Sequence, residues 1–276
     1  MMHNLYLTLP SNTEDFASNT TSEFRVRLPN ALELDGEWEM GLVEMQYPYS
    51  WNNVKGGYSK STQDNWILVE MSKNNPYYKG GLCEVTVPPG SYQDVETLIA
   101  AMHEALLKWK PSPKPGGIVK IKKPFLHKLV KLNYDSLHKR VKIKLDTTAI
   151  KGLIIGKTLQ YMLGFGGDRS QTFMKSVNFA DYPPDITSGF NTLFVYCDLV
   201  QPQIVGNLLA PLLRTVPISG EYGSSIDKVF LSPHYLPLRN KTFDAIEIVI
   251  KDDTNQAVKF NFGKVIIKLH LRRKQQ

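Results

Sequence analysis

Alternation of apolar and polar residues is the commonest pattern along this chain. In residues 258–262 (VKFNF) and 267–272 (IKLHLR) every second side chain is apolar, as expected for a β-strand that buries one face. Turn-forming Gly, Asp, Asn and Ser residues separate such stretches. The further predicted strands, which show alternation or a short apolar run, are residues 5–9, 24–28, 38–45, 66–71, 83–87, 125–132, 141–145, 193–198, 212–216 and 246–250.

Only one segment has a convincing helical period. Residues 95–109 place their large apolar side chains at spacings of three and four, which predicts an amphipathic helix that ends before Pro111. A second, short helical turn is expected over residues 157–163, ended by Gly164. Because strands joined by turns far outnumber helices, the expected fold class is mainly β, an antiparallel sandwich or barrel.

Positive charge is concentrated in one segment. Residues 108–144 hold 12 Lys and Arg and a single acid, Asp135, whereas the whole chain has 33 basic and 26 acidic residues. We interpret residues 108–146 as a loop followed by a lysine-alternating hairpin. This is expected to be an excursion from a single domain spanning residues 1–276, because so short a segment buries too little apolar surface to fold alone.

Two explanations of the basic segment stay open. A positive ribbon could bind the phosphates of a nucleic acid or another acidic partner. Alternatively, the lysines only keep a solvated strand soluble and discourage edge-to-edge pairing, which is the simpler explanation because it needs no partner. The candidate contacts for an anionic partner are Lys120, Lys122, Lys123, Lys128, Lys131, Lys139, Arg140, Lys142 and Lys144.

The residues that carry chemistry form no catalytic arrangement. Cys83 and Cys197 fall in predicted strands, and alternation places Cys197 on a buried face, so structural thiols are expected. The six histidines lack metal-ligand spacing. The glycines of LGFGGD end a helical turn rather than open one, and KDDTNQA is typical of a turn. We therefore expect no enzyme, cofactor or metal and, with no apolar run near about 20 residues, no membrane span.

The two ends of the chain carry longer and more distinctive stretches. Near the start are residues 5–12 (LYLTLPSN) and 36–51 (GEWEMGLVEMQYPYSW). Between these two lie residues 19–21 (NTT), which lead into 24–29 (FRVRLP). Toward the end are residues 193–216 (LFVYCDLVQPQIVGNLLAPLLRTV) and 243–273 (FDAIEIVIKDDTNQAVKFNFGKVIIKLHLRR), with the shorter stretches 162–165 (MLGF), 182–189 (YPPDITSG) and 233–238 (PHYLPL). These stretches resemble the penton, or minor capsid, proteins encoded by Polinton/Maverick elements and related adintoviruses. Residues 55–155 show little of this resemblance beyond the PPGSY turn and the helix after it.

The resemblance implies a single jelly-roll antiparallel sandwich with one amphipathic helix and an inserted basic hairpin. It further implies a structural protein, made in the cytoplasm or nucleus of the host cell, whose homopentamers close the five-fold vertices of an icosahedral virion capsid. Its partners would be a double jelly-roll major capsid protein and, through the basic segment, packaged DNA. Two alternatives stay open: a basic nucleic-acid-binding accessory protein and a jelly-roll carbohydrate-binding attachment protein.

Aromatic residues in proline-containing loops are the candidate subunit-interface residues. Such side chains supply a large contact area at little entropic cost. Packing on their own subunit would explain the same residues equally well. The candidates are Tyr47, Tyr49, Trp51, Tyr182, His234 and Tyr235.

Overall fold

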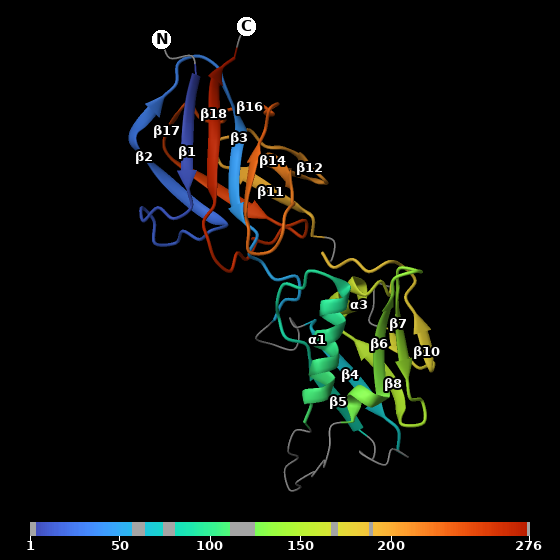
Figure 1. Ribbon diagram of the computed structural model, residues 1–276. Helices are drawn as coiled ribbons and strands as arrows, with labels where there is room; N and C mark the ends of the chain where they lie inside the picture. Colours follow the sequence, from blue (N-terminus) through green and yellow to red (C-terminus); the bar gives the residue numbers. More distant parts are fainter. Residues whose placement is uncertain are drawn as a thin grey trace. The chain divides into compact units, whose positions relative to one another are not determined.

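The chain folds into two compact units with separate hydrophobic cores. The computed structural model describes residues 4–56, 64–73, 81–110, 125–166, 171–187 and 190–274. The sandwich unit comprises Met1–Trp51 and Phe190–Gln276, and the inserted unit comprises Asn52–Gly189 (Figure 1). The sequence analysis expected one domain with a basic excursion at about residues 108–146. In the structure, the described part of that segment belongs to the second core rather than to a loop on the first.

Two antiparallel sheets face each other in the sandwich unit (Figure 1). One has the order β1-β18-β3-β15, with β16 also pairing with β3, and the other has the order β14-β11-β17-β2. The strands are β1 (Asn4–Pro10), β2 (Glu23–Glu33), β3 (Trp38–Pro48), β11 (Thr192–Cys197), β14 (Leu212–Pro217), β15 (Ser225–Val229), β16 (Leu236–Pro237), β17 (Thr242–Lys251) and β18 (Ile266–Arg273).

This strand order is that of a jelly roll. Counted along the chain, the eight long strands place the first, eighth, third and sixth in one sheet and the fifth, fourth, seventh and second in the other, which is the double Greek key of that fold. Alternation explains the core: Leu193, Val195 and Cys197 of β11 point inward and are at most 1% exposed. The structure thus confirms the prediction of a mainly β, jelly-roll fold, for the sandwich unit.

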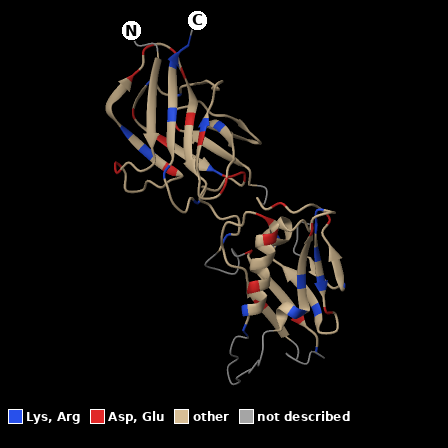
Figure 2. Ribbon diagram, in the orientation of Figure 1, with Lys and Arg blue, Asp and Glu red and all other residues tan. Residues whose placement is uncertain are grey.

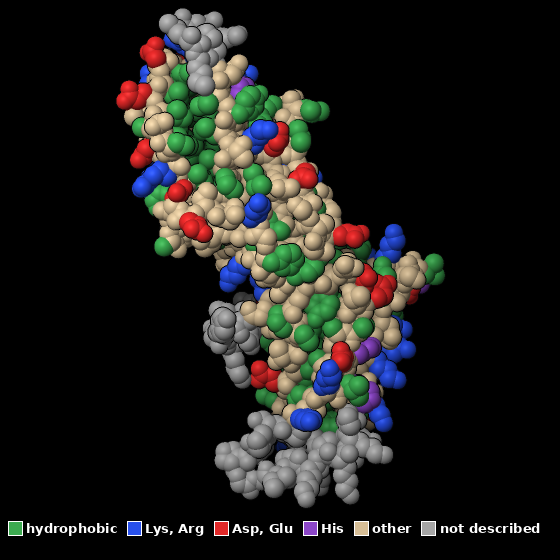
Figure 3. Space-filling view, turned by 60° about the vertical axis from the view of Figure 1, so that its left-hand side comes forward, with side chains coloured by type: hydrophobic (Ala, Val, Ile, Leu, Met, Phe, Trp, Pro, Cys, Tyr) green, Lys and Arg blue, Asp and Glu red, His purple; other side chains and the backbone are tan. Residues whose placement is uncertain are grey.

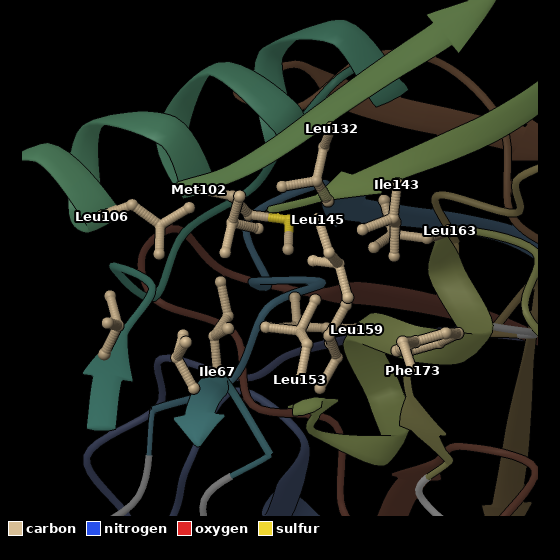
Figure 4. Close-up of a cluster of buried hydrophobic side chains, with 14 of the residues drawn as sticks. Ile67, Met102, Leu106, Leu132, Ile143, Leu145, Leu153, Leu159, Leu163 and Phe173 are labelled. Atoms are coloured by element: carbon tan, nitrogen blue, oxygen red, sulfur yellow. The ribbon is translucent and has the colours of Figure 1, made fainter. Parts of the chain in front are cut away.

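The inserted unit contains two sheets and the long helix. Its sheets have the orders β5-β4-β8-β9 and β10-β7-β6, and side chains from both sheets and the helix meet in one core (Figure 4). Its elements are β4 (Trp66–Met71), β5 (Gly81–Thr86), α1 (Val95–Lys108), α2 (Leu126–Leu129), β6 (Val130–Asp135), β7 (Arg140–Leu145), β8 (Ile150–Ile155), α3 (Lys157–Met162), β9 (Thr172–Phe173) and β10 (Val177–Phe179).

Helix α1 confirms the predicted amphipathic helix. It starts at a capping box, in which the Asp94 side chain accepts a hydrogen bond from the backbone N–H of Thr97 at 2.7 Å and the Thr97 side chain lies 3.4 Å from the Asp94 backbone nitrogen. Leu98, Met102 and Leu106 are at most 1% exposed. The helical period therefore marks the face that covers the core of the inserted unit.

One predicted strand is wrong, and another is right only for residues 130–132. Residues 258–262 form no strand: after the bridge between Lys251 and Ala257, the backbone N–H of Asn261 donates to the carbonyl of Ser50 at 3.1 Å. Phe260 packs edge-on against Trp51, with ring centroids 5.7 Å apart. The alternation there reflects packing of a loop rather than a sheet ladder. Residues 125–132 begin as helix α2, because Leu126 and Leu129 both reach the core at helical spacing.

Two loops predicted as turns are confirmed. Gly164 has φ +83 and follows α3, and the backbone N–H of Phe165 donates to Gln160 O at 3.0 Å, as in a glycine C-cap. In KDDTNQA, Oδ1 of Asp252 accepts hydrogen bonds from the backbone N–H groups of Thr254 and Gln256, both at 3.0 Å. The first motif therefore ends a helix and the second turns the chain, as predicted.

Candidate assembly and anion-binding surfaces

Three of the predicted interface residues belong to an aromatic cluster of the sandwich unit. Tyr47 is 0% exposed and Trp51 is 6% exposed. Tyr49 stacks on Trp51 at a centroid distance of 4.4 Å, and Trp51 meets Phe190 edge-on at 5.3 Å. Burial raises the pKa of Tyr47 and of Tyr49. The side chains of Tyr47 and Trp51 therefore pack in the core of their own unit and are not accessible to a neighbouring copy.

The other three predicted interface residues are at least partly accessible, and they belong to different units. Tyr182 is 62% exposed and belongs to the inserted unit. His234 is exposed, and its neighbour Tyr235 is partly buried on the outer face of the β1-β18-β3 sheet. There the Tyr235 hydroxyl lies 2.7 Å from Nδ1 of His270, and the Arg272 guanidinium lies 3.5 Å from the Tyr235 ring centre. These contacts hold Tyr235, and the loop that carries it, against strand β18.

The sequence analysis missed an exposed apolar hairpin. Strands β12 (Gln203–Val205) and β13 (Leu208–Ala210) pair only with each other among the described strands. Ile204 is 81%, Leu208 62% and Leu209 73% exposed. The signal was present in the sequence, because residues 199–213 contain no charged side chain. Alternation alone had assigned most of this stretch to no element.

The basic segment forms part of the outer face of sheet β10-β7-β6. The side chains of β6 and β7 alternate, so that Leu132, Val141 and Ile143 are at most 1% exposed, whereas the basic residues between them are exposed or partly exposed. Figure 2 shows their positions along the two strands in blue. Across the strands, Lys131 is the register partner of Lys144. The basic residues that lie on or beside this hairpin are Lys128, Lys131, Lys139, Arg140, Lys142 and Lys144. Lys120, Lys122 and Lys123 lie outside the described residues.

Few negative groups balance this face. The one acid of the segment, Asp135, is at the hairpin turn, where its Oδ2 lies 2.7 Å from Nδ1 of His138. Hydrogen bonds from His138 lower the pKa of Asp135. Lys142 lies 4.8 Å from the ring centre of the exposed Phe179 on β10. Like charges placed opposite each other destabilise a sheet, so the Lys131–Lys144 pair is electrostatically unfavourable within the hairpin.

The two cysteines of the described chain are buried thiols. Burial raises the pKa of the Cys83 thiol to about 12 and also raises the pKa of the Cys197 thiol, so neither is a ready nucleophile. Among the described residues, no three His, Cys, Asp or Glu side chains gather as metal ligands would. A hollow of about 740 Å³ is lined by Glu70 and Lys151, which form an ion pair with each other at 2.6 Å. In the same described part of the chain, no helix has the length and apolar character needed to cross a membrane.

Comparisons with known proteins find similarity among solved structures. No protein-family model matches the chain, and a search of curated proteins finds no match. Among solved structures, the selenomethionine-labelled penton protein of mavirus is similar, with a TM-score of 0.49 and 11% sequence identity. The alignment covers 98% of this chain and 99% of that chain. The assignment of the sandwich unit as a jelly roll rests on its own strand order.

Proposed function

We propose that this chain is a minor capsid, or penton, protein, five copies of which close a five-fold vertex of an icosahedral virion. The observation that carries this proposal is the jelly-roll strand order of the sandwich unit. Most of the sequence stretches that resemble penton proteins, among them residues 5–12, 36–51, 193–216 and 243–273, lie in that unit, whereas residues 162–165 and 182–189 belong to the inserted unit. The longest resembling stretches and the jelly-roll strand order therefore support the proposal through the same unit.

In this function the work is geometric rather than catalytic. Five identical subunits form a closed ring only through a heterologous contact, in which one flank of each copy meets a different flank of the next. The ring then fits among copies of a double jelly-roll major capsid protein, the partner implied by the sequence resemblance. The buried thiols and the internally paired charges described above agree with a protein that acts through its surfaces.

Mass photometry and analytical ultracentrifugation of the full-length protein test the proposal. We expect a species with five times the 31.3 kDa mass of the chain, present alone or after addition of the major capsid protein. Its population should rise with protein concentration. A chain that stays monomeric from nanomolar to high micromolar concentration, with and without that partner, would contradict the proposal.

A second activity, polyanion binding by the inserted unit, is favoured by the cross-strand Lys131–Lys144 pair. We propose that the outer face of sheet β10-β7-β6 contacts the phosphates of packaged DNA. Charge reversal of Lys142 and Lys144 should weaken binding of duplex DNA and reduce the slope of log affinity against log salt by about 1 for each lost contact. The matched control is Lys151→Glu, an exposed lysine of the same unit that pairs with Glu70.

The outcomes of that experiment separate the explanations of the basic face. Weaker DNA binding with an intact fold supports a DNA contact, and equal loss in the control indicates only a general charge effect. Wild-type protein that binds no DNA but loses assembly on charge reversal points to an acidic capsid partner instead. A variant that behaves like the wild type in both assays leaves the lysines as a solubilising surface.

The carbohydrate-binding alternative gains no specific support. It would be favoured by exposed tryptophan and tyrosine side chains in a shallow groove. The exposed Tyr161 and Tyr182 belong to the inserted unit rather than to the jelly roll, and the chain has four tryptophans. Trp38 and Trp51 are buried, and Trp66 and Trp109 are partly buried. Tyr6 is 59% exposed, but stacks on His270 at a centroid distance of 4.5 Å as part of the sheet surface.

A further inference from the structure

The hairpin β12-β13 projects apolar side chains that its own unit does not cover. Ile204 and Leu209 are register partners, and both are more than 70% exposed, at 81% and 73%. Gly206, with φ +63, turns the chain between the two strands. An isolated two-stranded hairpin is marginally stable in water, and exposed apolar patches of this kind mark contact surfaces. The hairpin therefore has the character of an element that packs against something else.

A second apolar surface, here called the leucine patch, occurs on the same unit. It consists of leucines of β1 and β2 and of the chain that follows β2, all partly exposed and all packed against the core. Leu9, further along β1, is only 1% exposed, so the inward-facing leucines of β1 are more accessible toward the beginning of the strand. Figure 3 shows apolar side chains gathered on this side of the unit. The patch is formed by Leu5, Leu7, Leu28, Leu32 and Leu34.

An unpaired sheet edge adjoins the leucine patch. Among the described strands β1 pairs only with β18, so the other edge of β1 is open. Open edges invite pairing with another chain, and proteins usually protect them with charge or with a covering element. The inward-facing residues of β1 beside this edge are leucines rather than charges. Both observations indicate that a protein surface covers β1.

The hairpin and the leucine patch lie on opposite flanks of the sandwich. β1 and β2 are the edge strands on one flank, and β15 and β14 are the edge strands on the other. The hairpin leads directly into β14, and the Gln203 side chain donates a hydrogen bond to Leu212 O at 2.6 Å. The hairpin therefore belongs to the β14 flank, away from β1.

The two surfaces also lie at the same end of the sandwich, the end where β3 begins at Trp38. Val200, just before the hairpin, bridges to Leu238, next to Pro237, whose partner is Glu39 of β3. On the opposite flank, β2 ends at Glu33 only a few residues before Trp38. Placing one surface against the other therefore requires a rotation with little translation along the rotation axis, and such a contact closes into a ring of five when the rotation is one fifth of a turn.

We propose that hairpin β12-β13 of one copy packs on the leucine patch and the β1 edge of the next copy. The occupant is a second copy because the same chain presents both a protruding apolar hairpin and a partly exposed apolar patch at the same end of the sandwich. This inference deepens the proposed function, on which it rests, by naming the two flanks that meet in the ring. It replaces Tyr47 and Trp51, which are buried, as interface residues.

The first test removes the apolar character of the hairpin. In the double variant Ile204→Glu with Leu209→Glu, both changed side chains are exposed, so the subunit should keep its thermal stability while pentamers fall at least tenfold in mass photometry. The matched control is Leu137→Glu, an apolar residue of the inserted unit that is 84% exposed. Pentamers that persist at the wild-type level in the hairpin variant would overturn the interface while leaving the proposed function intact.

A mixing experiment tests that the contact is heterologous. A patch variant, Leu32→Glu, keeps a normal hairpin, and the hairpin variant keeps a normal patch. Each alone should be monomeric, whereas their mixture should form a one-to-one dimer that grows no further. Homodimers of either variant would indicate a self-complementary contact and overturn the proposal.

Cysteine crosslinking covers the case in which Leu32→Glu fails to fold. The double variant Leu209→Cys with Leu32→Cys should form, on mild oxidation, a reducible ladder that ends at five chains. Cys83 and Cys197 are buried, so the native protein offers no competing thiol. If the double variant forms pentamers but gives no ladder, the interface is overturned. If the wild-type protein forms no pentamers, the proposed function is overturned and this interface with it.

Discussion

The two units of this chain are built by opposite strategies. In the sandwich unit the ends of the chain pair with each other, as in the contact of Asn4 with Arg272. In the inserted unit hairpins between successive strands, such as β6 and β7, form the ends of both sheets, and β4 and β8 join segments within the unit. The first strategy gives a closed frame whose flanks are set by distant segments, and the second gives an independent core with a charged face. The difference indicates that assembly geometry and charge are separate properties of separate units.

The largest effect should come from emptying one core at a time. Leu269→Ala, at a residue 0% exposed in the sandwich core, should lower the free energy of unfolding of that unit by about 2–5 kcal/mol. Leu98→Ala, also 0% exposed, is its counterpart in the inserted unit. Urea unfolding followed by tryptophan fluorescence, with Trp66 and Trp109 or Trp38 and Trp51 replaced by Phe, reports the units separately. Equal shifts of both transitions by either variant would show that the units unfold as one.

A smaller effect is expected at the start of helix α1. Asp94→Ala removes the side chain that accepts the Thr97 N–H at 2.7 Å and should cost about 0.5–2 kcal/mol, in the inserted unit only. Asp94→Asn keeps an acceptor and serves as the control. The same urea experiment measures both variants, and a loss in the sandwich transition would contradict the separation of the units.

The inserted unit should also weaken in acid because of His103. Its Nε2 accepts the backbone N–H of Leu132 at 2.9 Å, and burial, with the nearby His127, lowers its pKa from 6.5. The folded state then binds fewer protons than the unfolded state, so stability rises with pH below 6.5 and is lost as pH falls. His103→Gln should flatten this dependence in thermal melts of the inserted unit.

The sandwich unit offers a matched comparison for that pH dependence. Burial, together with Arg272, lowers the pKa of His270, so His270→Gln should flatten the acid response of the sandwich transition and leave the inserted transition unchanged. An acid response that persists in the inserted unit of His103→Gln would assign it to other groups.

The smallest effect is a gain in stability. Lys144→Thr keeps a good strand residue and removes one of the two opposed charges of the Lys131–Lys144 pair, so the inserted unit should become more stable by about 0.2–1 kcal/mol at low salt. Lys151→Thr, which removes a lysine paired with Glu70 at 2.6 Å, should give no gain. A gain that is equal in both variants would remove like-charge repulsion as the cause.

Much of the local structure could be predicted from the sequence. The alternation in residues 193–198 and 267–272 marks strands β11 and β18, and the helical period of residues 95–109 marks α1. These predictions succeed because neighbouring residues decide them. They fail for residues 258–262, where the same alternation arises from packing of Phe260 on Trp51 across the loop.

The candidate surfaces were less accessible to sequence reasoning. Lys131 and Lys144 could be assigned to a hairpin face, but only the register shows that they lie opposite each other. Tyr47 and Leu209 both lie in stretches rich in large apolar or aromatic residues, so the sequence does not distinguish them. In the structure Tyr47 is fully buried, whereas Leu209 is 73% exposed. Exposure depends on which strands pair, and alternation carries no information about partners.

By itself the sequence determined the positions of most strands, the ends of α1, the turn at Asp252 and the segment that holds the positive charge. Each of these depends on interactions within a few residues. Only the tertiary structure decided that there are two cores, that Tyr47 lies inside one of them, and that hairpin β12-β13 and the leucine patch occupy opposite flanks. Those features depend on pairing between segments as distant as Asn4 and Arg272, which is selected by the packing of the whole unit rather than by any local pattern.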